Sequence, residues 1–409
     1  MRKNTHITLL SVGHACVDLY QGAVAALIPY FVSERDYSYA VASGIVLAAS
    51  LLSSVAQPVF GALTDRWAMP WLLPVSTLLG GVGIGLSGLG GSYGLTLFFV
   101  AVSGIGVAAY HPESARVARL VTRGSHSGMG WFSLGGNIGF ALAPLFVAAA
   151  IGHGSLRWTP VLVLPALAGT ALCVPVLRAL AGPATGAAAR AVPRSADDVP
   201  SFLRLSLAVV FRSVVFTGLS TFISLYATQR TGGGATAGTT ALFLLFLGGA
   251  VGSVVGGSLA ERFDRVQVSR WSYLLSIAAV AGVVWVPGPA LHLFVALTSA
   301  GLYVPFSLQV TLGQDYLPSR VGTASGVTLG LTVSIGGLVS PLLGHLADST
   351  SLRTALTPLI AMPVLSWLLF RTLPEPAVRG PEPSGSADGT GAAAAAAEGP
   401  GTAAVSPVQ

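Results

Sequence analysis

One acidic side chain, Asp18, lies near the centre of an apolar run that extends from Ile7 to about Phe31. A charge at the centre of a bilayer costs about 2.5–3.5 kcal/mol on insertion scales, so it persists only where other groups compensate it. His14 precedes Asp18 by four positions and Gln21 follows it by three, which places the three side chains on one face of a helix. We therefore expect Asp18, assisted by His14, to bind and release a proton, and Gln21 to contact a substrate. The alternative is a structural hydrogen bond from Asp18 to His14 or to a neighbouring helix.

A basic side chain, Arg212, is isolated in a similar way in a later apolar run. Gly218 corresponds to Gly22 in the internal repeat described below, so Arg212 and Asp18 are expected at similar depths. A guanidinium group binds carboxylates and phosphates through two parallel hydrogen bonds. We therefore expect Arg212 to recognise an anionic or zwitterionic substrate. The alternatives are an ion pair with Asp18 across a cavity and a role in helix packing or snorkelling.

Two further ionisable residues, His111 and Glu113, lie in the last third of another apolar run. Glu113 and Arg116 are three positions apart and can pair on one helix face, which would be a structural role. A matching segment 193 residues later has Val304 and Phe306 in the corresponding places, so the fold itself does not require the two ionisable groups. We expect Glu113 to assist proton coupling and His111 to contact the substrate, and which of them faces the cavity stays open.

The segments that hold these side chains are expected to span a membrane. Of the 409 residues, 53% are hydrophobic and 9% are charged, whereas soluble domains carry about 25% charged residues. A helical span needs about 20 apolar residues, and unbroken apolar segments of this length favour helices over a β-barrel. The predicted fold class is an all-α membrane protein with twelve transmembrane helices in two pseudo-symmetric six-helix bundles. The twelve spans are expected at about residues 7–31, 39–62, 70–89, 93–118, 127–150, 157–177, 203–226, 238–259, 271–287, 290–312, 322–346 and 354–371.

An internal repeat divides the chain into two halves. Three features recur in the same order at offsets of 193 to 197 positions: Gly61-x-Leu63-x-Asp65-Arg66 with Gly257-x-Leu259-x-Glu261-Arg262, Tyr110-x-Pro112-x-Ser114 with Tyr303-x-Pro305-x-Ser307, and Pro144 with Pro341. Many secondary transporters build a central substrate site from duplicated membrane halves. The repeat predicts bundles at residues 1–178 and 203–372, a linker at 179–202, and a low-complexity, disordered tail at 373–409.

The distribution of basic residues predicts the orientation in the membrane. If the N-terminus lies inside, the termini and the even-numbered connections carry sixteen Lys and Arg, and the opposite face carries four. Lys and Arg are enriched on the cytoplasmic side of membrane proteins. We therefore expect a multi-pass protein of the cell membrane with both termini in the cytoplasm. The scattered Arg residues do not form the basic, aromatic-rich patch that is expected for nucleic-acid binding.

The sequence lacks the motifs of several other classes of protein. No Gly-x-x-x-x-Gly-Lys-Ser/Thr loop occurs, so ATP-driven pumping by this chain alone is not expected. Cys16 and Cys173 lie inside apolar runs, and no His/Cys cluster has the spacing of a metal site. No segment outside the spans is long enough for a soluble catalytic or signalling domain. We expect no enzymatic activity, no catalytic residue, no cofactor and no metal.

Twelve spans in two halves, with Gly-x-Leu-x-Asp-Arg after the second span, resemble the major facilitator superfamily. Within it, residues 14–22, 110–114 and 128–144 resemble the fosmidomycin-resistance group of efflux proteins. The resemblance implies a monomeric transporter whose spans one, four, seven and ten line the cavity. It also implies proton-coupled export (antiport) of small molecules by alternating access, with fosmidomycin-like anionic antibiotics as candidate substrates. The alternative on the same fold is a proton-coupled importer or symporter of a small organic solute.

The resemblance also implies a conformational gate. In that superfamily the motif after span two helps to close the cytoplasmic side, so Gly61 would permit close packing and Asp65 would meet the start of span eleven. Arg66 and the residues of the second copy, Glu261 and Arg262, are expected in the same gate. The sequence departs from the usual Gly-Arg-Lys/Arg continuation after Arg66, which leaves the basic part of this lock without its usual residues.

Overall fold

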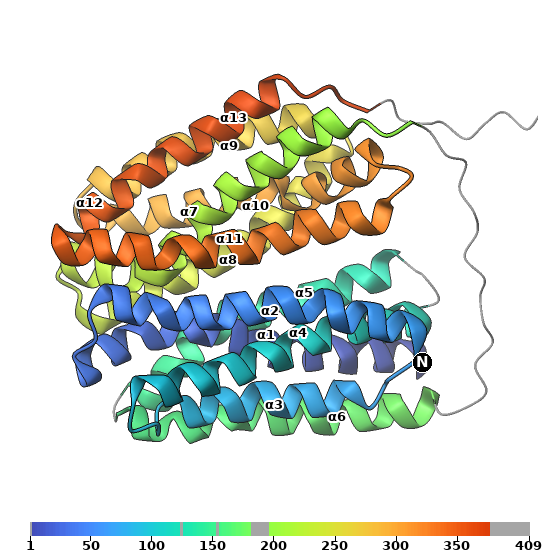
Figure 1. The fold of residues 1–409 in the computed structure, drawn as a ribbon, viewed down its shortest axis with the longest axis horizontal. Helices are drawn as coiled ribbons and strands as arrows, with labels where there is room; N and C mark the ends of the chain where they lie inside the picture. The colour runs from blue at the N-terminus through green and yellow to red at the C-terminus, as the bar shows by residue number, and fades with distance from the viewer. Residues whose placement is uncertain (1, 123–125, 153–154, 181–195, 377–409) are drawn as a thin grey trace, which may run out of the picture. The chain divides into compact units, whose positions relative to one another are not determined.

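The computed structural model describes residues 2–122, 126–152, 155–180 and 196–376. Most of the predicted linker (181–195) and of the predicted tail (377–409) lies outside this set. The regular elements in the described ranges are all helices, and their order confirms the predicted all-α fold (Figure 1). Among them, ten helical segments are long and apolar enough to cross a membrane, and one shorter apolar helix, α3, accompanies them.

The helices follow the predicted spans closely. The first half contains α1 (Arg2–Arg35), α2 (Tyr39–Arg66), α3 (Leu72–Ser87), α4 (Tyr93–Thr122), α5 (His126–Ile151), the 3-10 helix η1 (Leu156–Val163) and α6 (Leu164–Leu180). The second half contains α7 (Val199–Thr231), α8 (Gly234–Ala260), α9 (Arg265–Trp285), α10 (Ala290–Tyr316), α11 (Val321–Ser349), α12 (Leu352–Leu356), the 3-10 helix η2 (Thr357–Ile360) and α13 (Ala361–Arg371).

The sixth and twelfth spans begin with a helix break that recurs in both halves. Ser155 caps η1 and Ser351 caps α12, because each side chain accepts a hydrogen bond from a backbone amide of the following turn. Pro160 and Pro358 follow, and a proline has no N–H group for an α-helical hydrogen bond. Each span therefore passes through 3-10 geometry before it continues as α6 or α13. The sequence Ser-Leu-Arg occurs at both breaks, which extends the internal repeat.

The helices that carry the candidate site residues pack on one another. In the first half, α1 contacts α4, α5 and α6, and in the second half α7 contacts α8, α11 and α13. The halves meet where α2 contacts α11, α5 contacts α8 and α1 contacts α7 (Figure 1). Residues 1–375 form one compact unit, so the domain boundaries at 178 and 203 stay predictions that rest on the repeat.

Hydrogen bonds connect the end of the predicted linker to the second half. α7 already begins at Val199, and the side chain of Asp198 accepts a hydrogen bond of 3.1 Å from the amide of Ser201. A carboxylate in this place satisfies one of the free amides of the first helical turn. The amide of Asp198 in turn donates to the carbonyl oxygen of Tyr316 at 2.7 Å. This part of the linker is therefore held against the end of α10.

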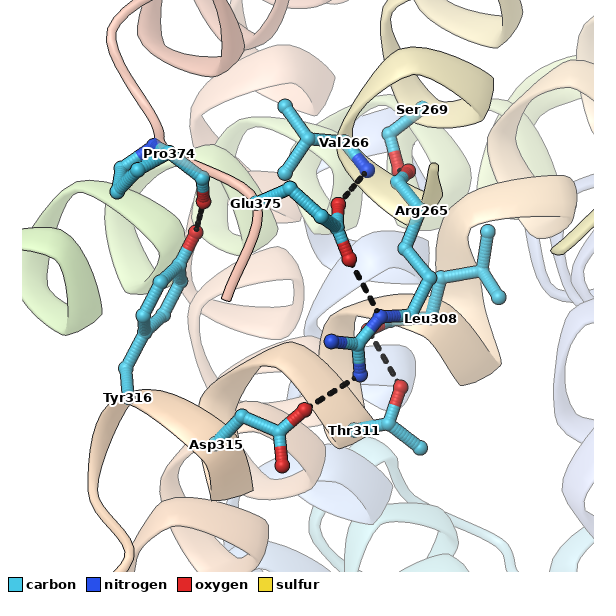
Figure 2. Close-up of polar contacts among 9 residues, drawn as sticks. All are labelled: Arg265, Val266, Ser269, Leu308, Thr311, Asp315, Tyr316, Pro374 and Glu375. Carbon is cyan, nitrogen blue, oxygen red and sulfur yellow. Dashed lines mark hydrogen bonds and ion pairs between the residues drawn. The ribbon is translucent and has the colours of Figure 1, made fainter. Parts of the chain in front are cut away.

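The first residues of the predicted tail, which begins at residue 373, contact the second half. The carboxylate of Glu375 accepts hydrogen bonds of 2.8 Å from Arg265 Nε and from the amide of Val266 (Figure 2). Arg265 Nη1 also lies 2.7 Å from Asp315 Oδ2. An arginine shared between two carboxylates, with a helix amide as an additional donor, orders the chain just beyond α13.

Candidate functional site

The structure brings Asp18 together with two histidines from two helices. In the middle of α1, Asp18 Oδ2 lies 3.2 Å from His14 Nε2, and Asp18 Oδ1 lies 3.0 Å from His111 Nε2 of α4. The side chains are 13%, 9% and 26% exposed, respectively, so the carboxylate is largely shielded and His111 is the most accessible member. We call these three residues the His14–Asp18–His111 triad. Each carboxylate oxygen faces a different imidazole.

A backbone carbonyl orients each imidazole ring. His14 Nδ1 lies 2.9 Å from the carbonyl oxygen of Phe132 in α5, and His111 Nδ1 lies 2.7 Å from that of Val107, one turn earlier in α4. The His14 ring also stacks on the ring of Phe132 with centroids 4.3 Å apart. These contacts turn both Nε2 atoms towards Asp18, as carbonyl groups do for the histidines of many functional sites.

Glycines of α5 make the space that the triad occupies. A Cβ atom on Gly139 would lie 2.0 Å from the carbonyl oxygen of Ala15, so the two helix backbones touch there. A Cβ atom on Gly136 would lie 2.4 Å from Asp18 Oδ2 and 2.6 Å from His14 Cε1. The glycine-rich segment of the fifth span therefore has a direct geometric role, because any larger residue at position 136 would collide with the triad.

The contacts within the triad are close but poorly aligned. His14 Nε2 and Asp18 Oδ1 are buried, and neither has an aligned hydrogen-bond partner. The donor atoms of the three residues lie within 4.8 Å of one another, a spacing at which they are also able to share a cation. Spacing along the chain did not indicate this arrangement because His111 lies far from the other two residues.

The two candidates on α4 have different surroundings. Glu113 is fully buried, and its Oε2 lies 2.9 Å from Arg116 Nε, with a second contact between Oε1 and Nη2. His111 and not Glu113 therefore contacts Asp18. These contacts do not support the expectation that Glu113 assists Asp18, and they agree with the structural interpretation of the Glu113–Arg116 pair. Sequence spacing alone did not decide between the two residues because it does not say which face of α4 meets α1.

Arg212 occupies an aromatic setting in the second half. It is 1% exposed, and its Cζ lies 4.9 Å from the ring centroid of Phe306 and 5.7 Å from that of Tyr303, both on α10. A cation over an aromatic ring gains about 2 kcal/mol when it is desolvated. Among the described residues, no ion pair joins Arg212 to Asp18, so the expected alternative of a direct pair is not formed in this conformation. Gln21, the other expected substrate contact, is exposed on α1.

Of the residues expected to form a gate, those whose side chains the structure describes do not join the two halves in this conformation. A Cβ atom on Gly61 would meet nothing within 4 Å. Arg66, Glu261 and Arg262 are exposed, and the side chain of Asp65 lies outside the described residues. Gly61, Arg66, Glu261 and Arg262 therefore do not lock the end of the bundle where α1 begins and α13 ends.

The opposite end is locked by Asp348, near the end of α11. Its Oδ1 accepts a hydrogen bond of 2.8 Å from the amide of Tyr39, and its Oδ2 accepts one of 2.9 Å from the amide of Ala40. These are the first two residues of α2, where free amides and the helix dipole favour a carboxylate. Gln229 of α7 adds a hydrogen bond of 2.9 Å from its Nε2 to the hydroxyl of Tyr39. Spacing along the chain did not predict this lock, because Tyr39 and Asp348 lie 309 positions apart.

Comparison with known proteins now identifies the family. The family model of the Major Facilitator Superfamily matches residues 10–341, which is most of the chain. This chain belongs to the Major Facilitator Superfamily. The match confirms the predicted twelve-helix architecture and makes the chain a multi-pass membrane protein of a transporter family.

Relatives of this superfamily member agree with the resemblance seen in its motifs. The fosmidomycin resistance protein of Escherichia coli (strain K12) is 30% identical over 374 residues, which cover 88% of this chain and 90% of the relative. The uncharacterized MFS-type transporter YfnC of Bacillus subtilis (strain 168) is 29% identical over 384 residues, covering 89% and 91%. Among solved structures, a bacterial homologue of the human lysosomal transporter Spinster in an inward-facing, occupied conformation has a TM-score of 0.74 at 15% identity, covering 89% of this chain and 95% of the other.

Proposed function

We propose that this superfamily member is a proton-coupled exporter of small molecules, with fosmidomycin-like anionic antibiotics among its substrates. The observation that carries this proposal is the carboxylate of Asp18 between two imidazoles in the middle of a membrane-spanning helix. Ionisable groups inside membrane segments mark proton relays and substrate pathways, and imidazole gains and loses a proton near neutral pH. The similarity to a fosmidomycin resistance protein supports export and an anionic substrate.

The proposed orientation has both termini in the cytoplasm. Its support is the count of sixteen Lys and Arg at the termini and even-numbered connections against four on the other face. In this orientation, the lock at Asp348 lies on the external side. The motif residues Gly61, Asp65, Arg66, Glu261 and Arg262 would then close the cytoplasmic side in the alternate conformation.

The proposed cycle assigns different tasks to the two halves. Asp18, with His14 and His111, exchanges protons, and Glu113 stabilises α4 through Arg116. Arg212 and Gln21 recognise the substrate. Arg212 leaves its contacts with the rings of α10 when α7 and α10 move. In alternating access, a proton enters and a substrate leaves one after the other through the same central cavity. We propose that the protein works as a monomer, without a cofactor and without enzymatic activity.

The test is transport in reconstituted vesicles. The purified protein is placed in liposomes with an imposed pH gradient, and the movement of fosmidomycin and of a panel of other small solutes is measured. We expect flux that depends on the gradient and is lost in Asp18→Asn, while the variant keeps the thermal stability of the wild type. Proton-dependent flux retained by Asp18→Asn would refute the assignment. Cells that lack the gene should accumulate more drug if the protein exports it, and less if it is an importer or symporter.

A further inference from the structure

We propose that the His14–Asp18–His111 triad is a binding site for a divalent transition-metal ion such as Zn²⁺. Spacing along the chain predicts no metal site, because His111 lies far from the other two residues. The packing of α1 on α4 brings the three together, so that one donor atom from each residue lies within 4.8 Å of the other two. Among the described residues, no other group of three His, Cys, Asp or Glu side chains is arranged this closely.

The distances within the triad suit an ion that bonds to all three side chains. Zinc bonds to imidazole nitrogen at about 2.0–2.1 Å and to carboxylate oxygen at about 2.0–2.2 Å, so two ligand atoms of a tetrahedral ion lie about 3.3 Å apart. Asp18 Oδ2 lies 3.2 Å from His14 Nε2, and Asp18 Oδ1 lies 3.0 Å from His111 Nε2. A movement of less than about 1 Å at each donor atom would bring all three to bonding distance.

The outer nitrogens of both imidazole rings have the partners that are typical of metal sites. His14 Nδ1 lies 2.9 Å from the carbonyl oxygen of Phe132, and His111 Nδ1 lies 2.7 Å from that of Val107. A carbonyl oxygen only accepts, so each Nδ1 carries a hydrogen and each neutral ring has its lone pair on Nε2. Histidines that bind metal ions almost always donate their second N–H group to a carbonyl or a carboxylate in this way. Both lone pairs are therefore directed towards Asp18.

Two atoms of the triad are buried without a hydrogen-bond partner. They are His14 Nε2 and Asp18 Oδ1, one on each side of the contact between the two residues. Buried polar atoms without a partner are rare in native proteins, because leaving them unsatisfied costs free energy. A cation bound between the ring and the carboxylate satisfies both atoms at once, since it accepts a lone pair from each. This observation is independent of the distances and points to the same ligand.

The donor set favours a transition metal over Mg²⁺ or Ca²⁺. Imidazole nitrogens suit Zn²⁺ and its neighbours in the first transition row, whereas Mg²⁺ and Ca²⁺ take oxygen ligands. Three protein ligands leave one position of a tetrahedral zinc ion open for water or an anion. α5 closes the site next to His14, because a Cβ atom on Gly136 would lie 2.8 Å from Nε2. His111 is 26% exposed, so the open position lies on its side.

The consequence of this site for transport rests on the proposed function. An ion bound to the triad occupies the same carboxylate and imidazole atoms that we propose to exchange protons. It also joins α1 to α4 through bonds to residues of both helices. Zinc therefore acts as an inhibitor of gradient-dependent flux and not as a cofactor of the transport cycle.

The test is zinc binding to the full-length protein, purified without a histidine tag and placed in lipid nanodiscs. Titration calorimetry should show one bound Zn²⁺ per chain that an excess of Mg²⁺ does not displace. X-ray absorption at the zinc edge should show two imidazole ligands and an oxygen ligand at about 2.0–2.2 Å. His14→Gln, His111→Gln and Asp18→Asn should each weaken binding by about tenfold or more. His345→Gln, on the exposed face of α11, is the matched control and should bind zinc like the wild type.

Three results would overturn the proposed site. The wild type could bind no zinc at a ratio of one per chain, or its absorption spectrum could show fewer than two imidazole ligands. Neither of these results depends on the folding of a variant. The third is equal affinity in the three triad variants and the wild type, which would mean that histidines outside the triad hold the ion.

Flux in vesicles separates the site from the proposed function. Zinc at a concentration that saturates the site should slow the gradient-dependent flux of fosmidomycin in the wild type, and a chelator should restore it. Zinc that binds at the triad without slowing this flux would overturn the inhibition and leave the site intact. If no gradient-dependent flux occurs even without zinc, the proposed function fails, while the calorimetry and the absorption spectrum still decide whether the triad binds metal.

Discussion

His111 Nε2 lies 3.0 Å from Asp18 Oδ1, and this contact joins the fourth span to the first at the centre of the N-terminal half. Glu113, two residues further along α4, is fully buried and paired with Arg116 instead. The two neighbours on one helix therefore serve different purposes. Any movement of α1 against α4 changes the charge environment of Asp18 through His111 and leaves the Glu113–Arg116 pair intact, since both of its members belong to α4.

This difference predicts opposite phenotypes for two substitutions on α4. His111→Gln should abolish the dependence of flux on the pH gradient while changing thermal stability little, because the ring is partly exposed. Glu113→Gln should keep gradient-dependent flux and lower the unfolding free energy by about 1–3 kcal/mol, because it breaks a charge-assisted hydrogen bond at a buried site. The measurements are vesicle flux at two pH gradients and thermal unfolding in detergent. Loss of coupling in Glu113→Gln with normal stability would restore Glu113 as the proton carrier.

Substitution of Gly136 tests whether the space beside the triad is needed. In Gly136→Ala the new methyl group would lie 2.4 Å from Asp18 Oδ2, so the carboxylate or α5 must shift. Overpacking of this kind costs about 1–3 kcal/mol, and we expect flux to fall by about tenfold or more. Gly130→Ala is the matched control on α5, because its methyl group would meet nothing within 4 Å. Equal flux in the two variants would show that the triad tolerates displacement.

The lock between Tyr39 and Asp348 predicts a shift in conformation. Asp348→Asn removes the charge and one of the two acceptors at the start of α2. A carboxylate at an exposed helix N-terminus contributes about 0.3–1 kcal/mol, so the population that is open at this end should rise by about two- to fivefold. Spin labels at Asp36 and Ser351, in the loops that flank α2 and α11, should then show a longer distance. His345→Gln, on the exposed face of α11, should leave the distance distribution unchanged. An unchanged distribution in Asp348→Asn would mean that other contacts hold this end closed.

Arg212 offers a test of anion recognition. Arg212→Lys keeps the charge but loses the planar pair of donors that binds a carboxylate or phosphonate in two places. We expect KM for fosmidomycin to rise by about tenfold, with a smaller effect on any uncharged substrate found in the solute panel. Thermal unfolding serves as the control for folding. If KM rises equally for charged and uncharged substrates, Arg212 has a role in helix packing around Phe306 and Tyr303 instead.

The contacts of Glu375 predict where the chain can be shortened. A protein that ends after Pro376 retains the pairing of Glu375 with Arg265 and should unfold at the wild-type temperature (Figure 2). A protein that ends after Thr372 loses this pairing and the carbonyl oxygen of Pro374, which accepts a hydrogen bond of 2.6 Å from the hydroxyl of Tyr316. Its unfolding free energy should fall by about 1–3 kcal/mol. Glu375→Gln in the full chain should lower the unfolding free energy by part of this amount. Equal unfolding temperatures for the two truncated proteins would show that the contacts of Glu375 and Pro374 do not stabilise the fold.

The sequence by itself determined the architecture and some of its chemistry. Low charge content and long apolar runs leave helices that span a membrane as the stable arrangement, because each backbone polar group must be satisfied within its own segment. The repeat that contains Gly61 and Gly257 revealed two related halves. The pairing of His14 with Asp18 was visible as well, since residues four apart share a helix face.

Only the tertiary structure decided which distant residues meet. His111 joins Asp18, Gly136 makes room for both, and Asp348 caps α2, because these contacts depend on the rotation and depth at which helices pack and not on spacing along the chain. The same reason explains why the position of Glu375 was not predicted, since its partner Arg265 lies 110 positions earlier. Helix periodicity specifies a face, and packing between helices specifies what that face meets.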